Sequence, residues 1–288
     1  MKAAAVRYAR PESLTQAFAL LAEHGDSAQI LAGGQSLVPM LNLRLAQPEL
    51  LIDITRIPGL NAITVENGVV RIGALVTHRE LEHSFLIARH APLLAKAVPH
   101  VAHVAIRNSG TVGGSVALAD PAAEYPACLL ALDASIVLAS SNGERRLRAG
   151  DFFQGIYSTA IEPGELVSAI EFAASGSGQV FAFAELARRH GDYAMIGLAA
   201  VARRDGSGGA ARLSELRLAF LGAGPTPMLA QQAAAQVIGR ILDNASVLAA
   251  QNMLENELSP LDDLNAKAAT KLHMARILLA RVLRELTQ

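Results

Sequence analysis

Cysteine is nearly absent from this chain, because its 288 residues include only Cys128. No disulfide can form within the chain, which fits a reducing cytoplasm, and we expect the protein to be cytoplasmic. Iron–sulfur clusters are typically held by several cysteine thiolates, so this chain has too few to house one. Any such cluster in its chemistry would belong to a partner. Cys128 lies in the apolar stretch 126–132, where we expect an inert buried thiol rather than a nucleophile.

Long hydrophobic runs and an excess of charge are missing as well. The longest apolar run, residues 194–202, contains a glycine and is far shorter than the ~18 residues that a membrane-spanning helix needs. We therefore expect no transmembrane segment. Residues 1–8 lack the apolar core and cleavage site of a signal peptide, so we expect none. The net charge is −1 and no block of lysine or arginine occurs, which gives no indication of a nucleic-acid partner.

Patterns typical of metal sites and catalytic nucleophiles are also absent. His100 and His103 lie close together, but no thiolate or carboxylate stands at a matching ligand spacing. Residues 113–117 lack the glycine that follows the serine of a nucleophile elbow. Residues 222–225, Gly-Ala-Gly-Pro, lack the third glycine of a dinucleotide fingerprint, and we expect a strand-to-helix turn there. We expect neither a metal nor a catalytic residue in this chain.

Two glycine-rich segments are the most informative feature that is present. The first, residues 32–36, reads Ala-Gly-Gly-Gln-Ser, and the second, residues 111–115, reads Thr-Val-Gly-Gly-Ser. Glycine suits a backbone that approaches a ligand closely, and consecutive N–H groups in such a loop suit a phosphate. Two of these loops suggest a ligand with a pyrophosphate and bulk on either side. Neither has P-loop or Rossmann spacing, so ordinary turns remain open as an alternative.

The first part of the chain predicts a small βαβ unit. Ser13 and Gln16 form a capping-box pattern at the start of a helix that ends at Gly25. Residues 28–32 read as a buried strand that leads into the first glycine loop. Ser36 then caps a short helix through Leu43, and residues 50–54 return as a second strand.

The middle of the chain predicts two hairpins and several helices. Asn-Gly at 67–68 and at 142–143 stands between alternating apolar runs, which is a strong hairpin signal. Thr77 and Glu80 form a capping box for a helix toward Arg89. The remaining expected elements are helical residues 93–98, a helix that starts at Pro121 and buries Leu129, Leu130 and Leu132, and a strand at 166–172.

The last part of the chain predicts strands first and helices later. Residues 175–178, Ser-Gly-Ser-Gly, read as a linker, and we place a domain boundary there. Strands are expected at 180–186, 197–203 and 213–221, with a turn at 204–209, and helices at 227–242, 245–257 and 260–286. With mixed units earlier, this order indicates an α+β protein.

Two further residues have both a simple and a functional interpretation. Glu124 is either a favourable charge in the first turn of a helix or a carboxylate that accepts hydrogen bonds from a ribose, and the first is favoured without more context. Tyr193 follows the charged residues 188–192, which are typical of an exposed loop, but its ring could be presented to a flat ligand.

Together these motifs resemble the FAD-binding medium subunit of molybdenum hydroxylases, the group that includes carbon monoxide dehydrogenase, nicotine dehydrogenase and bacterial aldehyde oxidoreductases. The resemblance covers nearly the whole chain and keeps the order of the motifs. It rests on residues 32–39, 51–54, 106–115, 120–124, 163–166 and 191–194.

The resemblance implies a two-lobed vanillyl-oxidase-type FAD domain and a smaller C-terminal domain. The N-terminal lobe would span residues 1–58 and the second lobe residues 59–175. Residues 176–288 would form a domain like the C-terminal part of the carbon monoxide dehydrogenase flavoprotein, with a three-stranded antiparallel sheet and a helical bundle.

By the same resemblance, the backbone N–H groups of the two glycine loops would hold the FAD pyrophosphate. Glu124 stands where relatives have aspartate toward the adenosine part, Val101 and Val167 would flank the flavin, and Tyr193 would lie near its isoalloxazine. The implied contacts in the loops are Ala32, Gly33, Gly34, Gln35, Ser36, Leu37, Thr111, Gly113, Gly114 and Ser115.

The chain departs from the family pattern in three places. Glutamate replaces aspartate at Glu124, and the lysine that relatives place near Ala184 or Glu185 is absent, which removes a cation near the flavin. Thr270-Lys271 stands where relatives commonly have Tyr-Arg, a difference that concerns subunit contacts. The first loop has no histidine to attach the cofactor covalently, so we expect dissociable FAD.

The function implied is electron transfer within a three-subunit hydroxylase. A large subunit would hold the molybdenum cofactor, a small subunit two [2Fe–2S] clusters, and this chain would pass electrons from the clusters through FAD to an external acceptor. The resemblance implies a dimer of heterotrimers. The alternatives are a stand-alone FAD-dependent oxidoreductase and a nucleotide-binding subunit with no redox role.

Overall fold

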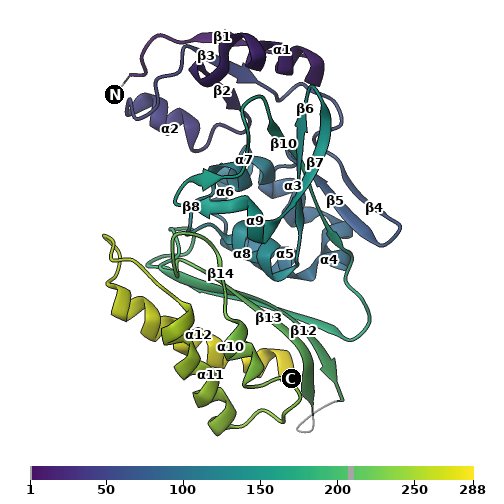
Figure 1. Ribbon diagram of the computed structural model, residues 1–288, viewed down its shortest axis with the longest axis vertical. Helices are drawn as coiled ribbons and strands as arrows, with labels where there is room; N and C mark the ends of the chain where they lie inside the picture. Colours follow the sequence, from purple (N-terminus) through teal and green to yellow (C-terminus); the bar gives the residue numbers. More distant parts are fainter. Residues whose placement is uncertain (1, 207–210) are drawn as a thin grey trace.

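A parallel sheet and two antiparallel sheets follow one another along the long axis of the molecule (Figure 1). The computed structural model describes residues 2–206 and 211–288 of the chain. In Figure 1 the N-terminal elements, in purple, lie at one end, and the C-terminal helices, in yellow, lie at the other. The chain is α+β, as the sequence predicts.

The N-terminal elements form the predicted βαβ unit around a three-stranded parallel sheet. Its strands lie in the order β1-β3-β2, with Arg7 and Ala28 both paired with Leu50. β1 is not predicted from the sequence, because it is only three residues long and does not alternate. The elements are β1 (Arg7–Ala9), α1 (Leu14–His24), η1 (Gly25–Ser27), β2 (Ala28–Leu31), α2 (Leu37–Asn42) and β3 (Leu50–Asp53).

The caps of these two helices differ. The Ser13 side chain accepts a hydrogen bond from the Gln16 N–H at 3.2 Å, as predicted, although the Gln16 side chain accepts from Glu12 instead of from Ser13. The prediction that Ser36 caps α2 is wrong. Its φ of −105° and ψ of −44° are already helical, and its side chain makes no capping hydrogen bond.

The middle of the molecule is a five-stranded antiparallel sheet in the order β4-β5-β10-β6-β7. Both predicted hairpins are confirmed. Asn67 and Gly68 take φ values of +51° and +77°, as the tight turn between β4 and β5 requires. The strands of this part are β4 (Ile63–Glu66), β5 (Val69–Gly73), β6 (Ser135–Ser140), β7 (Gly143–Arg148), β8 (Phe153–Gly155), β9 (Ser158–Thr159) and β10 (Leu166–Ala173).

Helices cover this sheet in shorter pieces than the sequence predicts. The capping box of Thr77 and Glu80 is confirmed, but its helix ends at His83, and Ser84 caps a separate one. Pro121 does not start a helix, because the Asp120 side chain accepts from the Ala122 N–H and holds a turn there. The helices are α3 (His78–His83), α4 (Phe85–His90), α5 (Pro92–Ala97), η2 (Val98–His100), α6 (Val104–Arg107), α7 (Val112–Leu118), α8 (Glu124–Ala131) and α9 (Ala149–Phe152).

The C-terminal part contains the three predicted strands and a short fourth one. The sheet has the order β11-β12-β13-β14, and the turn at 222–225 leads into β14 instead of into a helix. The predicted turn at 204–209 lies partly outside the described residues. The elements are β11 (Gln179–Leu186), β12 (Ile196–Asp205), β13 (Arg212–Leu221), β14 (Met228–Leu229), α10 (Gln231–Ala235), α11 (Asn244–Glu257) and α12 (Ala268–Thr287).

Two of the C-terminal helices are shorter than predicted. The region before α12 is a loop because Asp262 and Asp263 accept hydrogen bonds from the N–H groups of Ala268 and Asn265. α10 ends early, and Gly239 takes a φ of +74° and donates its N–H to the Leu213 carbonyl. No helix within the described ranges is both long and apolar enough to cross a membrane.

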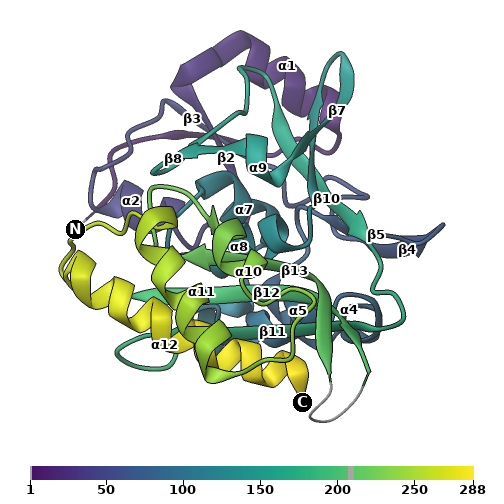
Figure 2. The same cartoon turned by 60° about the horizontal axis from the view of Figure 1, so that its bottom comes forward.

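The C-terminal sheet is buried on both faces. α10 and α12 pack on one face, where Leu198 and Phe220 lie, and α11 packs on these two helices. α11 and α12 stand in front of the sheet in Figure 2. α5 and α8 pack on the other face, where Phe183, Ala199 and Leu221 lie. Side chains of β11 that point to this second face therefore meet the middle part of the molecule.

Candidate functional site

The two glycine-rich segments lie against each other in space. Gly33, two residues after the end of β2, packs on Ser109 and Gly110, which precede α7. A Cβ atom on Gly33 would lie 2.8 Å from the Gly110 Cα and still closer to the Ser109 carbonyl oxygen. Only glycine permits this approach, so the two segments form one site between the N-terminal and middle parts.

The first segment keeps its backbone donors free. Among the described residues, none accepts a hydrogen bond from the N–H groups of residues 33–37. The loop is held by other groups: Val38 donates its N–H to the Gly34 carbonyl at 3.0 Å, and the Gln35 amide donates to the Gly33 carbonyl at 2.9 Å. Gly34 takes a φ of +70°. Consecutive free N–H groups in such a turn make a concavity that suits an anion.

The second segment is not the loop that the sequence suggests, because residues 112–115 form the start of α7 with Thr111 as its N-cap. Its N–H groups are used inside the protein. Gly113 donates to the Ala74 carbonyl at 2.9 Å, and Gly114 donates to Thr111 Oγ1 at 3.1 Å. Gly113 is buried against Ala74, whereas Gly114 is exposed. A ligand would therefore meet the Thr111 hydroxyl and the open face of Gly114.

A short series of contacts joins this segment to the N-terminus of α8. His78 donates its N–H to the Gly110 carbonyl at 2.9 Å, and its Nδ1 is hydrogen-bonded to the Tyr125 hydroxyl at 3.0 Å. Burial, together with the nearby Arg107, lowers the pKa of His78 to about 4, so the ring is neutral at pH 7. Neither His78 nor Tyr125 is predicted from the sequence as a site residue.

Glu124 begins α8 and is almost fully buried, at 7% exposure. Its carboxyl group makes no hydrogen bond or ion pair with the side chain of another described residue. Burial, followed by the charges of Glu185 and Asp120, raises the pKa of Glu124 to about 7. The simpler interpretation of Glu124, a charge at the start of a helix that is exposed to water, therefore does not describe this buried carboxyl group.

Glu185 lies near Glu124, at the end of β11. Its side chain is only 5% exposed, and its Oε1 lies 3.4 Å from Nδ1 of His100 in η2. Its Oε2 has no hydrogen-bond partner among the described residues. The contact with Glu185 raises the pKa of His100. The sequence marks this position only by the missing lysine, although a charged residue on the inward face of an apolar strand is a usable signal.

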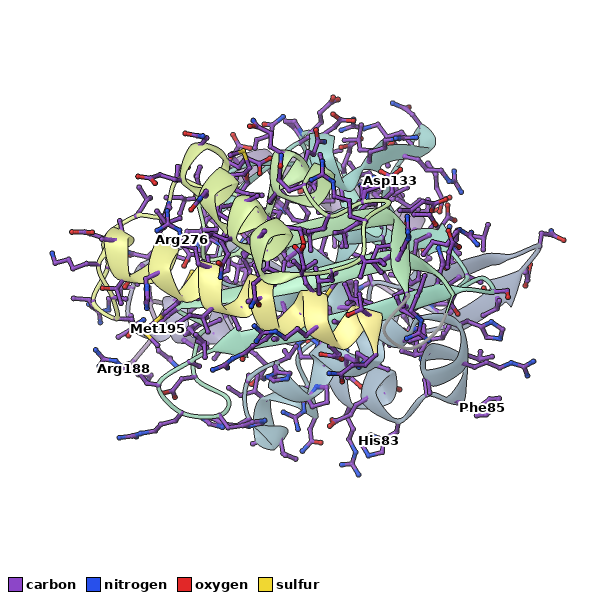
Figure 3. The ribbon with its side chains drawn as sticks, turned by 90° about the horizontal axis from the view of Figure 1, so that it is seen from below. His83, Phe85, Asp133, Arg188, Met195 and Arg276 are labelled. Carbon is purple, nitrogen blue, oxygen red and sulfur yellow. The ribbon has the colours of Figure 1, made fainter. Side chains whose placement is uncertain are left out.

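Val101 and Tyr193 border the same region. Val101 follows His100 and is buried, and the next residue, Ala102, takes a φ of +47°. Gly191, in the turn between β11 and β12, packs so closely on Ala102 that a Cβ there would lie 3.0 Å from its carbonyl oxygen. Tyr193 is 67% exposed in that turn, whose ends are marked by Arg188 and Met195 in Figure 3.

We call the region of His100, Val101, Glu124, Glu185 and Tyr193 the seam, because it lies where the β11 sheet meets the middle part of the molecule. Partial burial and the charges of Asp120 and Glu124 raise the pKa of the Tyr193 phenol.

Val167 lies with the second glycine segment. Val167 is buried on β10. The carbonyl of the next residue, Ser168, accepts a hydrogen bond from the Ala74 N–H, and the Ala74 carbonyl accepts one from the Gly113 N–H. Of the residues predicted by resemblance, the structure brings the two glycine segments together and brings Val101, Glu124 and Tyr193 together at the seam. His78 and Tyr125 connect the two groups.

The remaining candidates have simple environments. Cys128 is fully buried, as its apolar surroundings predict, and burial raises the pKa of its thiol. The rings of His100 and His190 lie 5.9 Å apart. In the described part of the chain, no group of three or more histidine, cysteine, aspartate or glutamate residues is arranged to hold a metal ion.

Two family models match the chain. The FAD binding domain in molybdopterin dehydrogenase matches residues 4–173, and the CO dehydrogenase flavoprotein C-terminal domain matches residues 181–286.

Curated relatives match over nearly their whole length. The chain is 38% identical to the 6-hydroxypseudooxynicotine dehydrogenase complex subunit alpha of Paenarthrobacter nicotinovorans, over 98% of this chain and 95% of that one. It is 37% identical to the carbon monoxide dehydrogenase medium chain of Hydrogenophaga pseudoflava, over 96% of this chain and 95% of that one.

Solved structures agree. A chain of carbon monoxide dehydrogenase from Hydrogenophaga pseudoflava superimposes with a TM-score of 0.94 at 38% identity, covering 99% of this chain and 98% of that one. A chain of quinoline 2-oxidoreductase from Pseudomonas putida 86 superimposes with a TM-score of 0.92 at 35% identity, also covering 99% and 98%.

Proposed function

The chain belongs to the family of FAD-binding medium subunits of molybdenum hydroxylases, and we propose that it is the electron-transfer subunit of such a complex. It is a subunit of an oxidoreductase, and its cofactor is FAD. In the proposed role it accepts electrons from iron–sulfur clusters of a small partner subunit. A large partner subunit holds the molybdenum cofactor, and the electrons leave to an external acceptor. The proposed assembly is a dimer of heterotrimers in the cytoplasm.

The observation that carries the proposal is the first glycine segment with its unused donors. The N–H groups of residues 33–37 find no acceptor in the described part of the chain, and Gly33 presses this loop against Ser109 and Gly110. A pyrophosphate supplies the negative oxygen atoms that such a loop lacks. The residues present therefore fit FAD.

The proposed contacts follow the resemblance. Residues 32–37 bind the pyrophosphate through their N–H groups. Thr111 and Ser115 add hydroxyl groups, and Gly113 and Gly114 leave room for the ligand. When bound, FAD supplies the redox chemistry, because it accepts electrons singly or in pairs. The chain itself binds, orients and partly covers the cofactor.

Val101 and Tyr193 belong to the flavin end of the site in this proposal. The resemblance implies that Glu124 points toward the adenosine part and that Tyr193 lies near the isoalloxazine. Gly191, two residues before Tyr193, packs on Ala102, the neighbour of Val101, which supports the placement of Val101 and Tyr193 at that end. Glu124 keeps the assignment that the resemblance implies, and we assign Val167 to the region behind the second glycine segment.

The proposed domain division is 1–58, 59–175 and 176–288. The family matches, of which one ends at residue 173 and the next begins at 181, support the boundary at 175.

The first test is the absorption spectrum of the purified full-length chain. It should carry the visible bands of an oxidised, non-covalently bound flavin, released by acid or heat as FAD. A colourless chain that takes up no added FAD would contradict the proposal and favour a nucleotide-binding subunit without a redox role.

A variant of Gly33 tests whether the first glycine segment binds FAD. Gly33→Ala should weaken FAD binding roughly 10- to 100-fold, since overpacking typically costs about 1–3 kcal/mol and here separates the two segments. Gly150→Ala is the matched control, because its Cβ would meet only a Leu130 methyl group at 3.7 Å. Equal flavin content in both variants would contradict the assignment of the loop.

Co-purification tests the subunit role. Expressed with its neighbouring genes, the chain should elute with an iron–sulfur protein and a larger molybdenum protein. Full turnover of a substrate by the isolated chain would favour a stand-alone flavoprotein instead.

A further inference from the structure

His78 is a buried histidine that uses only one of its two ring nitrogens. The residue is 5% exposed, and its Nδ1 is hydrogen-bonded to the Tyr125 hydroxyl at 3.0 Å. Its other ring nitrogen, Nε2, makes no hydrogen bond with any described residue. Buried polar atoms nearly always have a partner in native proteins, so this nitrogen requires an explanation.

The hydroxyl of Tyr125 decides which ring nitrogen of His78 carries the proton. Tyr125 is fully buried, and Nδ1 of His78 is the one acceptor that its hydroxyl contacts in the described part of the chain. A hydroxyl has a single proton to donate, and leaving a buried donor unpaired costs free energy. Because burial lowers the pKa of His78 to about 4, the ring has only one proton at pH 7. The Tyr125 O–H therefore donates to Nδ1, and Nε2 carries the ring proton.

The Nε2–H group lies at the junction of the two glycine segments. A Cβ atom on Gly110 would lie 2.7 Å from Nε2, so the edge of the ring occupies the space that a side chain of residue 110 would need. Gly110 is also a residue on which Gly33 packs, and Thr111 follows it as the N-cap of α7. The backbone fixes this position, because His78 donates its N–H to the Gly110 carbonyl at 2.9 Å.

A ligand can reach Nε2 of His78. Two side-chain atoms of the described residues are both closed off from solvent and without a partner, and they are Oε2 of Glu185 and Nε of Arg217. Nε2 of His78 is unpaired but is not one of these two atoms, so part of the small exposed surface of His78 lies at Nε2. The donor is therefore open to a group that approaches the junction.

We propose that His78 is a FAD-binding residue whose Nε2–H donates a hydrogen bond to an oxygen of the pyrophosphate, while Tyr125 fixes the proton on that nitrogen. This inference rests on the proposed function, in which the two glycine segments bind FAD. The first segment offers free backbone N–H groups, but those of Gly113 and Gly114 are already bonded inside the protein. His78 supplies a donor on the side where the backbone has few left.

The position of the ring proton can be measured on the full-length chain before FAD is added. In a chain with isotope-labelled histidine, the nitrogen chemical shifts distinguish a protonated ring nitrogen from an unprotonated one. His78 should carry its proton on Nε2 at pH 7, and added FAD should shift the Nε2–H resonances. Protonation at Nδ1 instead would overturn the proposal.

Two substitutions separate the two contacts of His78. The amide of His78→Asn reaches the position of Nδ1 but not that of Nε2, so it keeps an acceptor for Tyr125 and removes the donor at the junction. Its FAD affinity should fall roughly 10- to 100-fold, because a hydrogen bond to a charged group is lost. The melting temperature of the FAD-free variant at pH 7 should stay close to that of the unmodified chain.

His78→Gln should have the opposite profile. Its longer side chain places an amide N–H near the position of Nε2 but leaves the Tyr125 hydroxyl without an acceptor. This variant should bind FAD more tightly than His78→Asn and melt at a lower temperature. A role in stability alone predicts that FAD affinity and melting temperature fall together.

His83→Asn is the matched control. His83 lies at the other end of α3 and is exposed, and its Nδ1 contacts the Arg79 carbonyl. The same substitution at this position should leave the FAD affinity and the melting temperature unchanged. Equal FAD affinity in His78→Asn and His83→Asn would overturn the proposal.

ADP tests which part of FAD is contacted, because it has two linked phosphates but no flavin. His78→Asn should weaken ADP, measured as a competitor of FAD, by about the same factor as FAD. A variant that loses FAD affinity and keeps its ADP affinity would refute a pyrophosphate contact. An unmodified chain that binds no FAD would contradict the proposed function itself, whichever nitrogen of His78 carries the proton.

Discussion

The glycine pairs at 33–34 and 113–114 occupy opposite kinds of position. The first pair keeps free N–H groups beside it, with Gly33 touching a neighbouring segment of the chain. The second pair lies in a helix, and its N–H groups are bonded to Ala74 and to Thr111. The first segment is thus prepared for an anion, whereas the second mainly holds the middle of the molecule together. Two similar glycine motifs can therefore serve ligand binding at one position and internal packing at another.

The largest effect should come from Gly113→Val. A Cβ at this position would lie 2.6 Å from the Ala74 Cα, and backbone atoms cannot move away as a flexible side chain can. We expect a loss of about 3 kcal/mol or more in the free energy of unfolding, measured by chemical denaturation of the FAD-free chain. If this variant were as stable as the unmodified chain, the conclusion that the second glycine segment serves packing would be wrong.

The anchor of the second segment should respond to pH. The folded-state pKa of His78 is lowered from 6.5 to about 4, so the unfolded chain binds more protons in this interval. Its contribution to stability is present above pH 6.5 and is lost as the pH falls toward 4, which amounts to roughly 3 kcal/mol. Denaturation at several pH values should show this loss of stability. The variant His78→Asn keeps an acceptor for the Tyr125 hydroxyl, and its stability should lack the part of the pH dependence that comes from His78.

Gly114→Val tests the open face of the second segment. Gly114 is exposed, and a Cβ on it would approach only the Thr111 Oγ1, at 2.9 Å. We expect the fold to persist and FAD affinity to fall on the order of 100-fold, because the valine would occupy the approach of the pyrophosphate. Ala117→Val, at an exposed position of the same helix, is the control. Stoichiometric flavin in Gly114→Val would show that the second segment does not contact the cofactor.

The smallest effect should come from Gln35→Ala. The Gln35 amide holds the Gly33 carbonyl at 2.9 Å, which orders the first loop before a ligand arrives. Since a neutral hydrogen bond contributes about 1 kcal/mol at most at an exposed position, FAD affinity should fall only a few-fold. Titration of the FAD-free chain with FAD measures it. A loss as large as that of Gly33→Ala would mean that the side chain, rather than the backbone, binds the ligand.

Local sequence determines much of this fold. The hairpin at Asn67-Gly68 and the capping box of Thr77 and Glu80 form as predicted, because residues a few positions apart supply both the donor and the acceptor. The same holds for the strands β11 to β13, which the apolar runs predict. The motif order was also enough to predict the family to which the chain belongs.

Other features depend on partners distant in sequence, and only the tertiary structure decides them. The second glycine segment becomes a helix start because Ala74 and Val76 accept its N–H groups. The Oε2 atom of Glu185 lacks a partner because the folding of β11 onto η2 and α8 buries the carboxylate, with only Oε1 beside His100. The sequence predicts which residues can bind a ligand and which can adopt the backbone conformation of a tight turn. Burial and hydrogen-bond partners, which arise when distant segments meet, decide which of their groups remain free for a ligand.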